Sequence, residues 1–507
     1  MIVSENTPPS PLKDTTPNLP HSQSSNINQD PPPSYGAAQT SQRSPLVQSH
    51  AGPSHIIAVS HPGQSPLKRF LKAFLVAALI WALVGLFIGT SVNVRTRKQE
   101  RATYDIPKDI HLQNCVEGPD MDTSPLFPFA SQNAMEQETS LQLIRVGKSY
   151  ELPLSSKNLF LLSREQRSLV GISRTFNIKS SPDLRADIIK VDVRIMTQRH
   201  DLLARVKTCH VSRRKEENGV GIFVLPYPQS SPFDGWLSME VVVTVPEVGW
   251  DPLRIKSFET DLPQFQHLLD STADFVEFDK LSLKSSNALI QAKSLKVHDQ
   301  VTIHTSNNAV QIESLVAKNA QIETSNGPIT GTYEATGSLS LKTSDKKIEV
   351  EVKLTSSDKK GNLWIKNSNG PIDAHVDLIS ADTHRAQDDV FTVSAITSNS
   401  DLLFDLLSLP YESSLKLEAK TSNDNAKVKL PQTFEGRFTL ETSNNAPSME
   451  RHSERDHDPA GRGRTRQLDD KSRLRNFWQG NVYWDKDHES LSDAKIRTSN
   501  GKAILVL

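Results

Sequence analysis

The chain contains little cysteine, few aromatic residues and almost no net charge. Of its 507 residues only Cys115 and Cys209 are cysteines, which excludes a disulfide framework and leaves one bridge or two free thiols open. Aromatic residues make up 6%, so any core must rely on leucine, isoleucine, valine and alanine. With 58 Lys and Arg against 59 Asp and Glu, no basic surplus favours nucleic acid, and we expect no nucleic-acid partner.

The chain also lacks the sequence motifs of the common catalytic and metal sites. There is no GxSxG, P-loop or HExxH motif, no cysteine pair at metal spacing and no glycine-rich calcium nonapeptide. His452, His457 and His488 lie near acidic residues, but in or beside a charged insert, which makes them weak metal-ligand candidates. We therefore predict a protein that is not an enzyme, with no cofactor and no catalytic, cofactor-binding or metal-binding residues.

Residues 1–66 are rich in proline, serine, glutamine and asparagine and show no apolar period. Such a segment buries too little apolar surface to offset its ordering entropy, so we predict a disordered N-terminal tail. Within it, Pro32, Pro33, Ser34 and Tyr35 form a Pro-Pro-x-Tyr motif. WW domains bind this motif in an extended polyproline conformation, so a WW-domain protein is a predicted partner of the tail.

An apolar segment follows the tail. Residues 73–94 contain no charged side chain, and at 1.5 Å rise per residue they would extend about 33 Å, enough to span a bilayer core of roughly 30 Å. We predict one transmembrane helix over 70–94, with the lipid bilayer as a partner. Ala78, Ala82, Gly85 and Gly89 share one face of this helix and include a GxxxG pair, which favours a homodimer through the helix.

The signals for the orientation of this helix disagree. Slightly more positive charge follows the segment than precedes it, and the chain has no Asn-x-Ser/Thr sequon, and both favour a cytoplasmic C-terminus. The WW-ligand motif favours a cytoplasmic N-terminus, because WW domains are cytosolic. We predict a single-pass membrane protein with its N-terminus in the cytoplasm and an extracellular or luminal C-terminal domain.

The rest of the chain has the patterning of β structure. After a linker at 95–138, the runs 188–196, 221–227 and 237–246 cluster or alternate β-branched residues between turn signals. They predict a β-sandwich-like domain over 139–275. A repeat domain follows over 276–507, so the predicted fold class is all-β, a sandwich-like region and then a β-solenoid with rungs of about 20 residues.

A Ser-Asn or Ser-Asp pair recurs through the second half of the chain, at spacings of 20, 19, 19, 24, 30, 24, 21 and 56 residues. A period near 20 is typical of a solenoid, and Thr precedes most of the pairs. We predict that each pair forms a corner between two strands and that the corner side chains stack in a hydrogen-bonded ladder. The corner residues are Asn287, Asn307, Asn326, Asp345, Asn369, Asn399, Asn423, Asn444 and Asn500.

Apolar residues flank the corners with a period of two. They lie four and six residues before a corner, as at Ile303 and Val301, and three and five residues after it, as at Val310 and Ile312. The inward parity therefore shifts at the corner, where we expect a bend in the left-handed conformation that Asn and Gly tolerate. The corner Asn has the inward parity of the preceding strand, and the Thr hydroxyls are expected to form a second ladder. Ordinary hairpin turns of an antiparallel sandwich are the alternative.

Residues 446–476 interrupt the repeat. They are charged, broken by Gly and Pro and free of apolar period, which predicts a disordered insert. The chain re-enters the repeat through the aromatic run 477–484 and continues to the strand after Asn500. We expect this terminal strand to cap the solenoid.

The Thr-Ser-Asn-Gly repeat with its flanking strands, over about 281–507, resembles adhesin-type β-repeat domains of unknown function from bacterial and fungal membrane-anchored proteins. The order of tail, membrane helix and β domain is similar to a fungal single-pass version. The resemblance implies a surface role, with a glycan or protein as ligand, and supplies no site residues. We therefore predict a non-enzymatic protein that displays a β-repeat domain for adhesion or binding.

Two other functions fit the sequence. A membrane-anchored adaptor would recruit a WW-domain ubiquitin ligase through the Pro-Pro-Ser-Tyr motif. A polysaccharide-active enzyme would use clustered carboxylates on a flat strand face, and Glu349, Glu351, Asp373 and Asp377 alternate outward. Outward acids are, however, also the usual pattern of a solvated strand.

Overall fold

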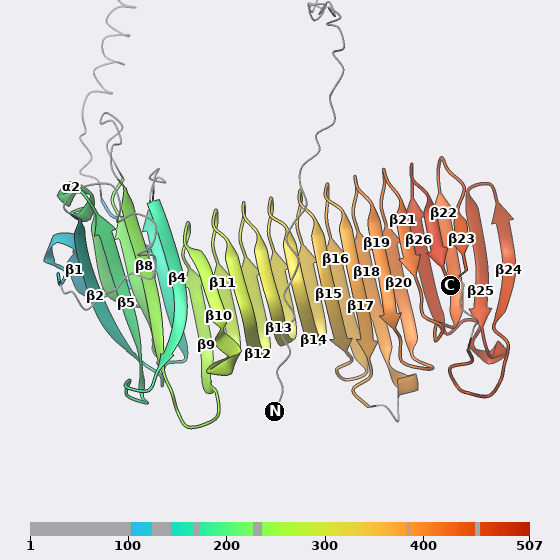
Figure 1. Cartoon of the computed structure of the whole chain (residues 1–507), viewed down its shortest axis with the longest axis horizontal. Helices are drawn as coiled ribbons and strands as arrows, with labels where there is room; N and C mark the ends of the chain where they lie inside the picture. Colours follow the sequence, from blue (N-terminus) through green and yellow to red (C-terminus); the bar gives the residue numbers. More distant parts are fainter. Residues whose placement is uncertain (1–102, 124–142, 166–171, 227–235, 383–385, 452–456) are drawn as a thin grey trace, which may run out of the picture. The chain divides into compact units, whose positions relative to one another are not determined.

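The computed structural model describes residues 103–123, 143–165, 172–226, 236–382, 386–451 and 457–507. All of them belong to one compact unit, Arg97–Leu507. Strands make up most of this unit, and consecutive strands stand side by side in a long row (Figure 1). The prediction of an all-β protein is confirmed.

The unit is built from rungs, each of which is a pair of strands joined by a bend. The strand that enters the bend lies in the pre-corner sheet, and the strand that leaves it lies in the post-corner sheet. Within each sheet, neighbouring rungs pair in parallel. At the other side of each rung, the return edge, the chain passes from the post-corner sheet to the next pre-corner strand. Stacked parallel rungs of this kind form a β-solenoid.

The pre-corner sheet has the spatial order β7 (Glu217–Val224), β3 (Asn158–Glu165), β9 (Leu253–Asp261), β11 (Val276–Lys284), the second halves of β12 (Ile290–His304), β13 (Val310–Glu323) and β14 (Ile329–Lys342), and then β16 (Lys360–Lys366), β18 (Val390–Ile396), β20 (Ser414–Lys420), β26 (Ser492–Thr498) and β22 (Gly436–Thr442). The post-corner sheet has the order β8 (Leu237–Pro246), β4 (Ile172–Ser181), β10 (Gln266–Ser271), the first halves of β12, β13 and β14, and then β15 (Ile348–Thr355), β17 (Ile372–Ile379), β19 (Leu402–Ser408), β21 (Ala426–Lys429), β27 (Ala503–Val506) and β23 (Ser448–Glu450).

Antiparallel strands follow both sheets at one end of the stack and the pre-corner sheet at the other, where the post-corner sheet ends on β23. Beyond β8 lie β5 (Ile188–Thr197) and β2 (Ile144–Pro153), and beyond β7 lie β6 (Val206–Ser212) and β1 (His111–Glu117). At the far end, β25 (Phe477–Tyr483) and β24 (Gln467–Leu474) follow β22. The described helical segments are short: α2 (His200–Leu203), η1 (Gly118–Asp120), η2 (Thr272–Asp274), η3 (Ala386–Asp388) and η4 (Lys486–His488).

The core lies between the two sheets. Val301, Ile303, Val310 and Ile312, which flank one corner, are all almost fully buried. Because the strands are parallel and in register, each inward side chain rests on the same position of the next rung. Burial of one such side chain contributes roughly 1.5–3 kcal/mol. The apolar residues that recur with a period of two in the sequence are therefore the residues that fill the core.

The stack begins well before residue 276. The strand pairs β7/β8, β3/β4 and β9/β10 are already parallel rungs, so the region 139–275 continues the solenoid rather than forming a separate sandwich. One hydrophobic cluster runs through both regions and includes Phe176 and Leu505. The two cysteines, which the sequence left open, form a disulfide between Cys115 of β1 and Cys209 of β6.

The predicted single-pass membrane localisation is corrected. Within the ranges that the structure describes, no helix is long and apolar enough to cross a membrane, and the one α-helix has four residues. The described chain instead consists of strands whose side chains alternate between the core and the outer face. A cytoplasmic N-terminus and an extracellular domain on a single-pass helix are therefore not supported. The segment 70–94, with Ala78, Ala82, Gly85 and Gly89, lies outside the described residues.

Candidate functional site: the corner edge and its terminal pocket

Each corner is held by main-chain hydrogen bonds to the preceding rung. The carbonyl oxygen of Ser286 accepts hydrogen bonds from the N–H groups of both Ser306 and Asn307, each at 2.9 Å. The same arrangement repeats at the next corner, where the N–H groups of Ser325 and Asn326 donate to the Ser306 carbonyl. This shared acceptor brings successive corners into register.

The corner side chains form a ladder along the outside of the stack. In each step the Nδ2 of one residue donates to the Oδ1 of the residue in the adjacent rung, and the shortest step joins Asn307 to Asn287. The other steps measure 2.5–2.7 Å and join Asn326 to Asn307, Asn369 to Asp345, Asn399 to Asn369, Asn423 to Asn399, Asn500 to Asn423 and Asn444 to Asn500. All nine predicted corner residues thus lie along one edge.

The ladder is exposed, which differs from the expected inward parity of the corner Asn. The buried residue is the Thr two positions earlier, and its hydroxyl bonds to the main chain rather than to another Thr. Thr305 donates to the Ala288 carbonyl at 3.1 Å, and Thr324 donates to the Asn308 carbonyl at 3.0 Å. The hydroxyl therefore satisfies a carbonyl of the preceding rung that would otherwise be buried without a partner.

The corners do not use the left-handed conformation, because none of the nine corner residues has a positive φ. Glycine follows some corners for a different reason. A Cβ on Gly327 would lie 1.8 Å from the carbonyl oxygen of Asn308 in the preceding rung. The close approach of neighbouring rungs, and not the backbone dihedral, selects glycine there.

Asp345 interrupts the ladder. It accepts a hydrogen bond from Asn369 at 2.5 Å but, being a carboxylate, has no N–H to donate to Asn326 on its other side. The main chain continues unbroken, since the N–H groups of Ser344 and Asp345 still donate to the Ser325 carbonyl. The ladder step between Asp345 and Asn326 therefore lacks the side-chain donor that the other steps have.

The last rung along the chain does not cap the stack. β26 pairs with β20 on one side and with β22 on the other, so the rung of Asn500 lies between the rungs of Asn423 and Asn444. The terminal strand was expected at the end of the solenoid. A rung with the shared corner pattern fits between any two others, so the pattern alone does not determine the spatial order.

A pocket of about 370 Å³ opens on the outer face where this inserted rung meets its neighbours. Lys420, Arg497, Glu441 and Phe477 occupy the same position on the adjacent strands β20, β26, β22 and β25, and all four line the pocket. The other lining residues are Thr421, Thr442, Ser443, Asn476, Thr498 and Ser499. Sequence reasoning missed this site because its residues come from separate segments that only the inserted rung brings together.

One rung of the corner edge lacks the Ser-Asn pair. Between β9 and β10 the bend consists of residues 262–265, and the buried imidazole of His267 fixes it. Its Nε2 lies 2.8 Å from the Thr260 hydroxyl and its Nδ1 lies 3.1 Å from the Phe265 carbonyl oxygen. Burial lowers the pKa of His267 to about 4, so the ring is neutral at physiological pH.

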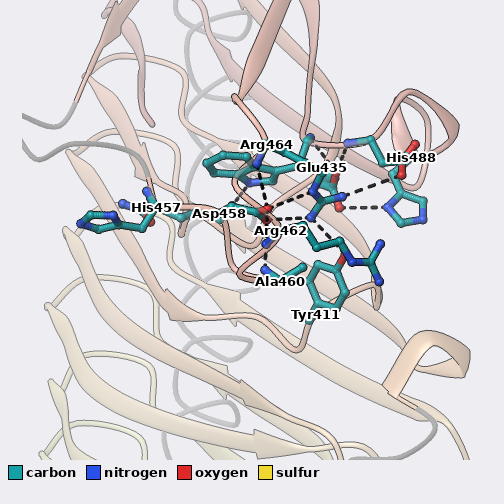
Figure 2. A network of polar contacts seen from close by, with 11 residues as sticks. Tyr411, Glu435, His457, Asp458, Ala460, Arg462, Arg464 and His488 are labelled. Atoms are coloured by element: carbon teal, nitrogen blue, oxygen red, sulfur yellow. Dashed lines mark hydrogen bonds and ion pairs between the residues drawn. The ribbon is translucent and has the colours of Figure 1, made fainter.

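The return edge carries a polar network at the same end of the stack (Figure 2). Glu435 is buried, with 1% of its side chain exposed, and accepts hydrogen bonds from the N–H groups of Trp484 at 2.6 Å and Asp485 at 2.9 Å. His488 Nδ1 lies 2.9 Å from the other carboxylate oxygen. These contacts tie the segment that precedes β22 to the segment that leads into the inserted rung.

Part of the insert that was predicted to be disordered is ordered by the same network. Asp458 accepts hydrogen bonds from the N–H groups of Ala460, Arg462 and Arg464 at 2.9–3.1 Å and from the Arg464 guanidinium at 2.8 Å. The Arg464 hydrogen bond holds the pKa of Asp458 well below its usual range. Arg464 also donates to the Tyr411 hydroxyl at 3.2 Å, which pins the insert to a neighbouring return loop.

His457 and His452 were the other metal-ligand candidates of the insert. His457 uses its main-chain N–H to bond Gln432, and His452 lies outside the described residues. Among the described residues, no group of three or more His, Cys, Asp or Glu could hold a metal ion. The WW-ligand motif, Pro32, Pro33, Ser34 and Tyr35, also lies outside them, so capture of a WW-domain protein stays a prediction.

The outward acids lie together on the post-corner sheet. Glu349 is directly opposite Asp373 in the neighbouring strand, and Asp377 is opposite Lys353. Lys347 forms an ion pair with Glu349, and the Glu351 carboxylate accepts a hydrogen bond from Thr332. Lysine and threonine partners of this kind are usual for acidic side chains on a solvent-exposed strand.

Comparison with known proteins agrees with this architecture. Residues 207–389 match the family Toastrack DUF4097, and residues 318–503 match a domain of unknown function, DUF7330. Both matches are to domains of unknown function, and each spans less than half of the chain. No curated protein matches the chain in sequence.

Solved structures similar to this chain come from bacteria. A candidate cell adhesion protein from Clostridium sporogenes is 8% identical, with a TM-score of 0.14, and the match covers 71% of this chain and 99% of that protein. A candidate adhesin from Parabacteroides distasonis is 11% identical, with a TM-score of 0.23 and 71% and 97% coverage. One from Parabacteroides merdae is 10% identical, with a TM-score of 0.18 and 71% and 96% coverage.

Proposed function

We propose that the chain is a non-enzymatic adhesion or binding protein in which the β-stack serves as a rigid recognition surface. The observation that carries this proposal is the exposed Asn ladder, with its corner residues in register along one edge. A side-chain amide has two N–H groups and two acceptor lone pairs, and the ladder uses one of each. A row of donors and acceptors therefore faces solvent at a spacing of about 4.8 Å.

This row is pre-organised for binding. The ladder hydrogen bonds already fix the amide orientations, and the core beneath them is fully packed. A ligand that bonds to the ladder would immobilise few additional side chains, which lowers the entropic cost of association. An ordered polar edge of this length supports a partner that is itself extended, such as a surface glycan or a protein strand.

Attachment of the full chain to surfaces tests the proposal. The purified chain is immobilised on a biosensor and presented with a panel of microbial cells and cell-wall polysaccharides, and we expect binding to at least one. The double variant Asn399→Ser with Asn423→Ser removes two ladder amides and is expected to weaken that binding roughly thirtyfold, since each lost hydrogen bond is worth about 1 kcal/mol. The control Asn362→Ser, on the outer face of β16 and away from the corners, should bind like the wild type.

Binding to no member of the panel would contradict the proposal, as would equal loss in the ladder variant and in the control.

A polysaccharide-cleaving enzyme is the alternative that the outward pair Glu349 and Asp373 favours, because glycoside hydrolysis uses two neighbouring carboxylates. Release of reducing ends from any polysaccharide of the panel, abolished by Asp373→Asn, would replace adhesion with catalysis.

A further inference from the structure

We propose that the terminal pocket binds one residue of a neutral saccharide; this specifies the ligand class of the adhesion function proposed above and rests on it. The pocket is a concave feature of the corner edge, and about 370 Å³ lies within the usual range of small-molecule sites. Such a volume takes a single sugar ring and is too small for a folded protein surface. The chemistry of its walls then decides among small ligands.

One wall of the pocket is aromatic and the others are polar. Phe477 points outward from β25, whereas the next residue, Trp478, is buried against Phe438. An aromatic face offers apolar contact to the C–H side of a sugar ring. The hydroxyls, the Asn476 amide and the charged ends of Glu441 and Arg497 offer donors and acceptors to sugar hydroxyls.

The charges of the pocket balance one another. Arg497 Nε lies 3.0 Å from the Glu441 carboxylate, and Arg497 Nη1 lies 3.7 Å from the Glu418 carboxylate. Glu418 lies beside the pocket rather than in its lining, and together with the lining residues Lys420, Arg497 and Glu441 it makes a group of two positive and two negative charges. An acidic sugar would bring its carboxylate towards Glu441 without a surplus of positive charge to compensate. The pocket is therefore matched to an uncharged ring.

The pocket is also rigid. Its floor consists of neighbouring strands of the pre-corner sheet, and the turn that carries Asn476 is fixed because the Asn476 carbonyl accepts a hydrogen bond from Thr442 N–H at 2.9 Å. The buried Thr498 hydroxyl is already engaged, donating to the Asp424 carbonyl at 2.9 Å. Binding residues on strands hold their geometry better than residues on loops.

The same sheet face offers a matched control. Trp364 is exposed to 43% and lies on β16, five strand-to-strand steps from β25, or about 24 Å away. It is an outward aromatic of the same sheet without the polar walls of the pocket. Loss of binding through Phe477 but not through Trp364 would locate the sugar in the pocket.

Saturation-transfer NMR on the full chain tests the proposal. The probes are the methyl glycosides of glucose, galactose, mannose and N-acetylglucosamine, with glucuronic acid and N-acetylneuraminic acid as acidic probes. We expect at least one neutral glycoside to bind, Phe477→Ala to raise its Kd by about tenfold or more, and Trp364→Ala to leave the Kd within about twofold. Circular dichroism and the thermal midpoint verify that both variants are folded.

A second variant makes the charge argument testable without removing the aromatic wall. Glu441→Gln retains the shape of the pocket but removes one negative charge, so we expect weaker binding of the neutral glycoside and a gain of binding by the acidic probes. Absence of binding by every neutral glycoside, preference of the wild type for acidic probes, or unchanged binding by Phe477→Ala would each overturn the proposal.

The two proposals fail in different ways. If Phe477→Ala still attaches to the surfaces bound by the wild type, the saccharide pocket is wrong and adhesion through the stack stands. If the wild type attaches to no surface but a neutral glycoside binds in the pocket, the pocket stands as a sugar site and the adhesion function fails.

Discussion

Every rung of the stack is closed twice, at the corner edge and at the return edge, and the two closures satisfy their polar groups differently. At the corner edge the donors and acceptors of one rung bond to the next, as Asn326 does to Asn307. At the return edge the loops bond within themselves, as when Ser413 N–H donates to the Pro410 carbonyl, and also to neighbouring loops through varied contacts, as Arg464 does to Tyr411. The nine Ser-Asn or Ser-Asp corners therefore share one set of contacts with their neighbours, whereas each return loop has contacts particular to its own sequence.

The lengths of the chain segments that form the corners and the returns reflect this difference. Nine corners have the same Ser-Asn or Ser-Asp pair, whereas the returns range from a register shift inside β12 and β13 to the segment between Ile379 and Val390. Return loops also contain left-handed residues, namely Asp358, Lys359 and Glu412. None of the nine Ser-Asn or Ser-Asp corner residues is left-handed, although Gln264 is, in the bend that lacks the pair. Corners that bond to one another must keep the same sequence, whereas a return loop that only connects two strands is free to vary in sequence and length.

The largest expected effect comes from insertion of one serine at each edge. Between Ser325 and Asn326 it would break about four hydrogen bonds to neighbouring rungs and cost roughly 4 kcal/mol of unfolding free energy. Between Tyr411 and Glu412 the same insertion lengthens a return loop and interrupts its two hydrogen bonds from Ser413 to the Pro410 carbonyl, so it should cost about 2 kcal/mol. Urea denaturation of the two variants measures the difference. Equal costs would mean that the edges are equivalent.

The next effect concerns the rung that lacks the Ser-Asn pair. The pKa of His267 is lowered from 6.5 to about 4 in the folded chain, so the unfolded chain binds a proton first as the pH falls. This contribution to stability is complete above about pH 6.5 and is lost between about pH 6.5 and 4, a change of about 3 kcal/mol. Denaturation at both pH values should show it, and in His267→Leu the difference between the two should shrink by this amount. A variant with undiminished pH dependence would place the effect elsewhere.

Removal of a buried corner hydroxyl is expected to cost less. Thr324→Val leaves the Asn308 carbonyl and the Gly327 N–H without their partner, which corresponds to about 2 kcal/mol. Thr302→Val, on the outer face of β12, is the control and should change stability by under about 0.5 kcal/mol. Thermal unfolding of both variants compares them, and similar midpoints would show that the corner hydroxyl is dispensable.

The smallest effect is a gain. Asp345→Asn supplies the N–H that Asn326 lacks as a donor and completes the ladder, so we expect about 1 kcal/mol of added stability. The same exchange at the return edge, Asp358→Asn, has no ladder to complete and should stay within about 0.5 kcal/mol of the wild type. Stabilisation of both variants alike would point to net charge rather than to the ladder.

The sequence predicts the corners and the flanking strands because both follow from repeated local demands. Val310 and its counterparts must face the core in every rung, and the corner pair must bond to its neighbours. The spatial order of the rungs could not be predicted, because the rung of Asn500 has the same corner pattern as the others and could form the same hydrogen bonds beside any of them. The early rungs escaped detection because His267, rather than a Ser-Asn pair, stabilises one of their bends.

The pocket and the ordered insert were also beyond sequence reasoning. Phe477 and Arg497 become neighbours only when the last rung inserts beside β22. The insert has the composition of a disordered segment, yet the contacts of Arg464 with Asp458 and Tyr411 fix it. Composition measures the average tendency of a segment to be disordered. A specific ion pair such as that between Arg464 and Asp458, together with a contact to a neighbouring loop, can override that tendency.

The antiparallel strands at the two ends determine how long the protein can become. An open parallel stack would offer its outermost strand to further copies and grow into a fibre. Here β25 beyond β22 and β5 beyond β8 run antiparallel to the stack, and the outermost strand β24 carries charged residues and a register shift, so these edges no longer offer the regular parallel strand of a rung. The rungs between them share one pattern, so duplication of a whole rung would lengthen the molecule without disturbing either end. Length is thus free to change by whole rungs during evolution, while the protein stays a single, finite molecule.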